Sequence, residues 1–361
     1  MNIKSCLLAS AATLVAFTSA RAADAVVVAE PEPVEYVRVC DTYGEGFFYI
    51  PGTETCLRIS GYLRYDAQAG DDVYSGGELD TWAKQSRATL RFDARTETEL
   101  GTLRSYADVR FNFTDGENGS GSDLHQGYIE LGGFQVGVND PIFGSWLGDA
   151  GDIINDDVIQ YSSDSFSTNE IRYTYVGGNG FSAVIAAEQG NNENDYDYTI
   201  DDYMPHVAAG AKFEQNWGSI GGIVGYDAVT EAVGVKARLD VKVNDVFSVW
   251  AMAGYQSDYD QDSFGTNSNR NWYGQWEGDW AAWAGFAAKV SDKATINGQG
   301  AYEDEGTYAF ALNVGYELVP GFTITPEVNY TKFDGARKDQ ALADGGDDNA
   351  FGGIIRFQRD F

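Results

Sequence analysis

The chain is poor in histidine, cysteine and positive charge, and each shortage excludes a class of function. Its 361 residues include 2 His and 3 Cys, and 24 Lys and Arg stand against 55 Asp and Glu, for a formal net charge of −31. A body this acidic argues against nucleic acid and anionic lipid surfaces as partners. The mean hydropathy of −0.32 excludes a helical membrane bundle.

The chemistry of enzymes and metal sites is also absent from the sequence. His125 and His206 stand singly, so no H-E-x-x-H zinc motif exists, and no P-loop occurs. The acidic run that begins at Asp258 opens like a calcium loop, but Ser263 replaces the turn glycine and Asn269 stands in place of the bidentate glutamate. We therefore predict that the protein is not an enzyme and has no catalytic residues, no cofactor and no metal site.

One apolar run stands out, and it lies at the extreme N-terminus. Lys4 precedes the apolar and small residues 6–17, and Ala20-Arg21-Ala22 matches an A-x-A cleavage site. The run is shorter than the ~20 apolar residues that a spanning helix needs. We predict that residues 1–22 form a signal peptide; the alternative is a buried N-terminal helix.

Two cysteines, Cys40 and Cys56, remain after the predicted cleavage. An even pair in an exported chain indicates one disulfide, and two free thiols are the alternative. A Pro-containing polar linker at residues 29–33 precedes them. We interpret residues 23–55 as a separate N-terminal segment and residues 56–361 as the main body.

The main body alternates polar and apolar residues with a period of two. In residues 86–98 and 101–113, for example, charged side chains share one face and apolar ones the other. The segments are about ten residues long, the length of a tilted strand that crosses a bilayer. We count about sixteen of them: 57–66, 86–98, 101–113, 124–131, 133–138, 169–176, 181–189, 206–215, 217–229, 232–243, 246–257, 277–291, 294–304, 307–318, 322–332 and 350–361.

Four features favour a transmembrane barrel over a soluble β-sandwich. The polar face carries charges of both signs, and the strands follow one another as serial hairpins. Short turns alternate with long acidic loops, which is typical of outer-membrane barrels. The chain ends on Phe361 after alternating apolar residues, like the recognition signal of such barrels. We predict an all-β, antiparallel transmembrane β-barrel, and we expect Trp272, Trp276, Trp280 and Trp283 to lie in an aromatic girdle; core packing is the alternative.

Several motifs resemble the alphaproteobacterial porin family, which includes the major porins of Brucella, Bartonella and rhizobia. The similarity runs across the whole chain. It is carried by Tyr36-Val37-Arg38-Val39-Cys40-Asp41, by residues 49–58, by Trp217-Gly218-Ser219-Ile220, by Phe247-Ser248-Val249-Trp250, by Tyr273-Gly274-Gln275-Trp276, by Leu318-Val319-Pro320-Gly321-Phe322 and by residues 352–359.

The resemblance implies a homotrimer of 16-stranded barrels that passes small hydrophilic solutes. It also implies that residues 139–168 form a loop that folds into the lumen and constricts the pore. On this loop we expect Asp152, Asp156 and Asp157 to face the pore. Opposite them we favour Arg87, Arg91, Arg104 and Arg110, because these repeat with one parity on neighbouring strands. The alternative is that each arginine is simply paired and structural, and that the aspartates cap turns.

We therefore expect a general-diffusion porin of the Gram-negative outer membrane, surrounded by membrane lipid and lipopolysaccharide. Its water-filled channel would carry small solutes and ions passively. Two alternatives remain: a structural or adhesion barrel, and a substrate-selective channel, for sugars for example. The strong negative charge predicts a weak preference for cations, against which the arginines act locally.

Overall fold

A computed structural model describes residues 38–119, 123–161, 167–192, 197–257, 259 and 270–361. The predicted signal peptide and residues 23–37 lie outside these described residues. Within them, three short helical segments occur: η1 (Asp41–Tyr43), α1 (Ile142–Ser145) and α2 (Gly335–Ala343). None of the described helices has the length and apolar character to cross a membrane.

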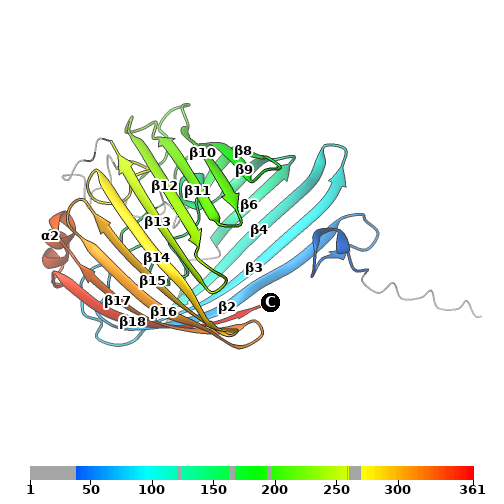
Figure 1. Cartoon of the computed structure of the whole chain (residues 1–361). Coiled ribbons are helices and arrows are strands. Elements are labelled where there is room, and N and C mark those ends of the chain that lie inside the picture. Colours follow the sequence, from blue (N-terminus) through cyan, green and yellow to red (C-terminus); the bar gives the residue numbers. More distant parts are fainter. Residues whose placement is uncertain (1–37, 120–122, 162–166, 193–196, 258, 260–269) are drawn as a thin grey trace, which may run out of the picture. The chain divides into compact units, whose positions relative to one another are not determined.

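The described residues form one antiparallel sheet that closes on itself. It holds eighteen strands, of which β1 (Phe48–Tyr49) and β5 (Glu117–Asn118) are two residues long, so sixteen longer strands build the wall. Neighbours in sequence are neighbours round the barrel, and the last strand pairs with the first long one, Ile354 opposite Gln68 (Figure 1). The strands are β2 (Cys56–Gly70), β3 (Ala83–Thr98), β4 (Gly101–Thr114), β6 (Asp123–Leu131), β7 (Phe134–Asn139), β8 (Thr168–Val176), β9 (Phe181–Glu188), β10 (His206–Gln215), β11 (Gly218–Tyr226), β12 (Val233–Lys242), β13 (Phe247–Gln256), β14 (Trp280–Ser291), β15 (Ala294–Glu303), β16 (Tyr308–Val319), β17 (Phe322–Lys332) and β18 (Asn349–Asp360).

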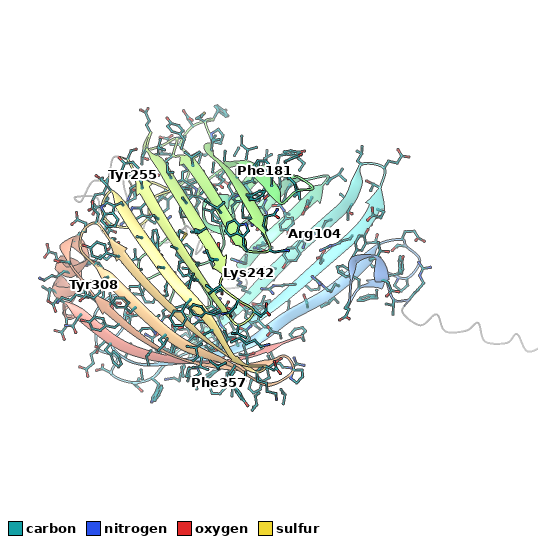
Figure 2. All side chains as sticks on the ribbon, in the orientation of Figure 1. Arg104, Phe181, Lys242, Tyr255, Tyr308 and Phe357 are labelled. Carbon is teal, nitrogen blue, oxygen red and sulfur yellow. A yellow bond between two sulfur atoms is a disulfide. The ribbon has the colours of Figure 1, made fainter. Side chains whose placement is uncertain are left out.

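The period of two in the sequence becomes an outer and an inner face of this wall. On β16, Phe310 and Leu312 are exposed, at 56% and 47%, whereas Ala309 and Ala311 between them are each 8% exposed. On β12, Val235 is likewise exposed beside a buried lysine. Side chains project from both faces of the barrel wall (Figure 2). The predicted barrel of about sixteen strands is confirmed, with apolar residues outward and polar residues inward.

The connections between strands differ in length at the two ends of the barrel. At one end the turns are short, as at residues 99–100, 132–133 and 320–321. At the other end long connections include 140–167, 189–205, 257–279 and 333–348, the last of which contains α2. We call these the short-turn end and the long-loop end. In outer-membrane barrels they face the periplasm and the exterior respectively.

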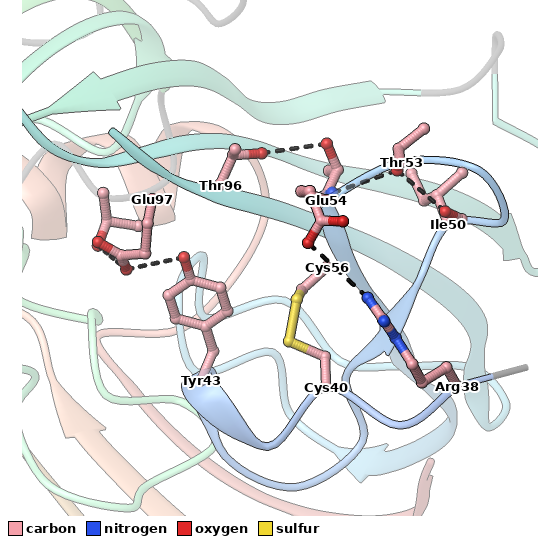
Figure 3. The surroundings of a disulfide bond; sticks show 11 residues. Arg38, Cys40, Tyr43, Ile50, Thr53, Glu54, Cys56, Thr96 and Glu97 are labelled. Atoms are coloured by element: carbon pink, nitrogen blue, oxygen red, sulfur yellow. Dashed lines mark hydrogen bonds and ion pairs between the residues drawn. A yellow bond between two sulfur atoms is a disulfide. The ribbon is translucent and has the colours of Figure 1, made fainter. Parts of the chain in front are cut away.

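The N-terminal segment, residues 38–55, packs at the short-turn end of β2 and β3. A disulfide joins Cys40 to Cys56, as predicted (Figure 3). Phe47 is buried in the same cluster. The Tyr43 hydroxyl donates to Glu97 at 2.8 Å, and the guanidinium of Arg95 lies over the Phe47 ring. The disulfide therefore holds an aromatic cap against the inner, charged face of the wall.

Replacing Cys40 with serine removes the link that closes this cap. We expect Cys40→Ser to destabilise the folded barrel by roughly 3 kcal/mol, because the unfolded chain regains the freedom of the closed loop. The measurement is the temperature at which the compact band on a heat-modifiability gel is lost. Cys56→Ser and the double variant should behave as Cys40→Ser does, with single-channel conductance nearly unchanged. Equal thermal stability of wild type and all three variants would contradict the stabilising role of the disulfide.

Candidate functional site

The candidate site is the interior of the barrel, where the long connection between β7 and β8 lies against the inner wall. This connection, loop 140–167, occupies the range in which the sequence placed a constriction loop. Its described part begins with α1 and contacts inward-facing side chains of successive strands from β10 to β17. The loop thus follows one half of the wall instead of extending into solvent.

An apolar cluster holds the first part of the loop to the wall. Ile142, Phe143 and Leu147 of the loop are almost fully buried among Met252 of β13, Trp283 of β14 and their neighbours. Burial of three such side chains removes their apolar surface from the pore water, a favourable change of about 1.5–3 kcal/mol for each. The hydrophobic core of this barrel therefore lies inside it, on one side.

Glycines on the inner face make room for this cluster. A Cβ at Gly221 would lie 2.7 Å from the Leu147 side chain, and one at Gly254 would lie 2.6 Å from the Trp276 ring. Either contact is closer than a Cβ normally makes, so glycine at these two positions lets Leu147 and Trp276 approach the wall closely.

A second set of contacts binds the backbone of the loop to polar side chains of the wall. Arg238 of β12 donates to the carbonyls of Gly148 and Asp149. Farther round the barrel, the Glu327 carboxylate accepts from the amides of Ile154 and Asn155 at 2.6 and 3.0 Å. Other donors to loop carbonyls include Lys236 to Tyr161, Trp283 to Ile159, Gln299 to Asp156 and Asn313 to Asp152. These bonds satisfy backbone groups that would otherwise lack partners inside the protein.

The predicted aromatic girdle is wrong for three of its four tryptophans. Trp272, Trp276 and Trp283 are 0%, 0% and 1% exposed, within the cluster that packs on loop 140–167. The alternative, core packing, holds for them. Trp280 alone of the four is exposed, and it stacks on Tyr302 of β15 at 5.5 Å between ring centres. Residues 270–279 carry two of these rings inward, which the spacing of the residues did not reveal.

The three loop aspartates that the sequence singled out lie near the middle of loop 140–167. Asp152 is exposed, and its carbonyl binds Asn313. The Asp156 carboxylate accepts from the Tyr161 hydroxyl at 2.6 Å, and that of Asp157 accepts from Tyr74 in the connection 71–82, also at 2.6 Å. Tyrosine hydroxyls thus fix two of the three carboxylates, which remain acceptors with capacity for further partners.

The four predicted arginines lie together on the inner face of β3 and β4. The register places Arg87 opposite Asn112, Thr89 opposite Arg110, and Arg91 opposite Asp108. Arg95 lies opposite Arg104, nearer the short-turn end. The arginines are therefore spread along the pore axis rather than gathered at one level. We call Arg87, Arg91, Arg95, Arg104 and Arg110 the arginine ladder.

Carboxylates of the wall neutralise this ladder only in part. Asp93, which is 1% exposed, is within ion-pair distance of Arg58, Arg95 and Arg104, at 3.7, 2.7 and 3.0 Å. Asp108 is shared by Arg91 and Arg110, at 2.7 and 3.6 Å. Each of these two buried carboxylates pairs with two or three guanidinium groups. Arginines therefore outnumber their carboxylate partners, and this part of the wall has a net positive charge.

The ladder and the loop are on opposite halves of the barrel. In the closed order of strands, β3 is half of the ring away from β12, which binds the loop through Lys236 and Arg238. The carboxylates within ion-pair distance of Arg91, Arg104 and Arg110 all belong to the wall, so no ion pair among the described residues joins these arginines to the loop. Positive charge thus lies on one half of the inner wall, and the other half carries the acidic loop.

Sequence reasoning missed the side chains that position the loop and the rings beside the ladder. Tyr106 and Tyr128 stack at 5.2 Å on the inner face, and Arg104 lies over both rings. Burial raises the pKa of Asp140, at the start of the loop, where the Gln126 amide and His125 hold its carboxylate against the wall. Among the described residues, no group of acidic, histidine or cysteine side chains is arranged to hold a metal ion.

Comparison with known proteins bears directly on this arrangement. The family model described as the porin subfamily matches residues 24–354. The chain belongs to this porin family. Porin Omp2a of Brucella melitensis is 53% identical, with 100% of both chains covered, and porin Omp2b of Brucella suis is 52% identical with the same coverage.

Solved structures share the fold at low sequence identity. The outer membrane channel DcaP of Acinetobacter baumannii superposes with a TM-score of 0.65 at 17% identity, over 87% of this chain and 99% of that one. An anion-selective porin from Comamonas acidovorans gives a TM-score of 0.57 at 12% identity, over 85% and 100%. Family and fold together make this chain a multi-pass β-barrel of the outer membrane.

Glu327 holds the loop in place at residues 154 and 155, because its carboxylate accepts hydrogen bonds from both amides. We expect Glu327→Ala to weaken docking of residues 154–157 by roughly 3 kcal/mol, because two loop amides lose a charged acceptor inside the protein. Single-channel recordings should then show larger and noisier open currents. Glu214→Ala, at the exposed short-turn end of β10, is the matched control. A quiet current of wild-type size from a correctly folded Glu327→Ala barrel would contradict this role.

Proposed function

We propose that the protein is a general-diffusion porin whose selectivity arises where loop 140–167 faces the arginine ladder. The observation that carries this proposal is the division of the inner wall: one half binds the loop, and the other half presents partly neutralised arginines. Small hydrophilic solutes and ions would pass between them without conformational change. A channel of this kind needs no catalytic group.

The constriction is proposed to consist of Asp152, Asp156 and Asp157 on the loop and of Arg87, Arg91, Arg104 and Arg110 on the wall. Opposite charges across a narrow passage orient the water between them. A nonpolar solute must displace that oriented water at a cost in free energy, whereas a polar solute replaces its hydrogen bonds. The arrangement therefore admits small polar solutes and disfavours apolar ones of the same size.

In the membrane we propose a homotrimer with lipopolysaccharide around its long-loop end. The resemblance to trimeric porins supports the trimer. The exposed aspartates of the long connections, such as Asp201 and Asp202, support bridging by divalent cations to lipid phosphates. We also propose that residues 1–22 direct export and are then removed.

Bilayer recordings test the channel itself. We expect the purified, folded protein to insert with ohmic conductance steps that arrive in threes, because each barrel of a trimer conducts independently. Glucose at millimolar concentration should leave the current unchanged. Silent bilayers from protein that shows the compact, heat-modifiable band would contradict a porin.

Charge substitutions on the two sides of the passage should shift ion selectivity in opposite directions. In a salt gradient we expect a weak preference for cations in the wild type, since the chain is strongly acidic. Asp156→Asn should move the reversal potential toward anion preference, and Arg91→Gln should move it toward cations. Shifts of the same sign, or none, would exclude these residues from the constriction.

A further inference from the structure

A polar cavity lies beside the outer part of the arginine ladder, where Ser167, the last residue of loop 140–167, contributes to its lining. Its volume is about 550 Å³, and its lining includes Arg87 and Arg110 together with residues from β6 and from the starts of β8 and the connection 189–205. Both arginines are in the half of their strands nearest the long-loop end. A solute that enters from outside would meet this cavity before the rest of the ladder.

The two arginines have donor capacity that the described residues leave unused. Arg87 donates through Nε to the neutral amide of Asn112 at 2.7 Å, and no described carboxylate lies within ion-pair distance of it. The buried Nε of Arg110 has no hydrogen-bond partner among the described residues, since Asp108 lies 3.6 Å away. Arginine binds oxyanions through pairs of parallel N–H groups, so these groups suit a phosphate or carboxylate.

The register puts the two side chains within reach of one ligand. Arg87 lies opposite Asn112 and Arg110 lies opposite Thr89, so the arginines are diagonal neighbours on the same face of an antiparallel pair. Diagonal neighbours in such a pair are about 7–8 Å apart at their backbones, a span that long side chains cover. Two guanidinium groups can therefore converge on one oxyanion.

The rest of the lining offers hydrogen bonds to hydroxyl groups. Ser167 and His125 contact each other at 3.2 Å, and the Asn169 amide donates to Gln189 at 2.7 Å. Asp123, also in the lining, is a carboxylate that would repel a second negative charge but would accept from a hydroxyl group. The cavity thus combines two arginines with a hydrogen-bonding remainder, in which Asp123, opposite Arg110 in the register of β4 with β6, carries the negative charge.

We infer that this cavity is a binding site for a small hydroxylated oxyanion, such as a sugar phosphate or a sugar acid, on its way through the channel. The inference rests on the proposed porin function and adds a solute class to it. The oxyanion would bind Arg87 and Arg110, and its hydroxyl groups would bind the amides and Ser167. Such a site raises the local concentration of the solute at the pore entrance and makes it interrupt the ion current transiently.

The test is a titration of single-channel current in potassium chloride with glucose 6-phosphate, gluconate or glucose added at the long-loop side. We expect glucose 6-phosphate to reduce the wild-type current in a saturable manner and glucose to have little effect. Arg87→Gln and Arg110→Gln should each weaken the block by about tenfold, the loss of one charged hydrogen-bonding partner. Lys242→Gln, the same change of charge at the short-turn end of β12, should leave the block unaltered.

The outcomes separate the inference from the function on which it rests. Stepwise conductance in potassium chloride alone tests the porin function and does not depend on whether any solute blocks the current. Block by both gluconate and glucose 6-phosphate would show that the site binds carboxylates and phosphates alike. Block by only one of them would show which of the two groups the site prefers. Equal block by glucose and glucose 6-phosphate, or block that Arg87→Gln and Arg110→Gln leave intact, would overturn the site.

Discussion

Backbone N–H and C=O groups that a segment buries against the inner wall of a barrel are removed from water and need protein partners, and this requirement shapes one half of the wall. Loop 140–167 finds them in side chains of the strands from β12 to β17, among them Arg238, Asn313 and Glu327. An unpaired backbone group in such a place costs as much as a lost hydrogen bond. The inward-facing side chains of these strands therefore bind the loop rather than the solute.

The division of the wall explains the contrast in composition between its two halves. The strands that contact the loop have inward-facing glycines, as at Gly221 and Gly254, which leave space for the side chains packed against them. Strands that face the passage need charge in contact with water and have the arginine ladder. Shared carboxylates such as Asp93 keep the guanidinium groups in fixed positions without cancelling their charge. A fixed, uneven charge across the passage is what makes a static pore selective.

The barrel could be predicted from the sequence because its signals are local. A period of two, an alternation of short turns and long loops, and a final aromatic residue can all be read along the chain. The parity of Arg87, Arg91, Arg104 and Arg110 follows from the same period, which is why the structure finds them on one face. The Cys40–Cys56 disulfide likewise follows from the presence of an even pair in an exported chain.

The parts that escaped prediction depend on contacts between distant residues. Trp272 and Trp276 have the sequence context of a membrane girdle, but their connection folds inward and buries them. Nothing adjacent to Glu327 in sequence indicates that it binds amides of residues 154 and 155. One feature of the sequence could have indicated these contacts: the glycines at inward positions of residues 218–254 lie where another segment of the chain packs against the wall. The axial spread of the arginines also required the register of β3 with β4.

The central claim is that solutes pass between the loop and the arginine ladder. The most direct test compares cysteines introduced at two adjacent residues of β3, Arg91 and Leu90, whose side chains face opposite sides of the wall. The native cysteines Cys40 and Cys56 are joined and do not react. A bulky thiol reagent should reduce the single-channel current of Arg91→Cys sharply and leave that of Leu90→Cys unchanged. Equal loss of current in both, or no loss in Arg91→Cys, would contradict the account.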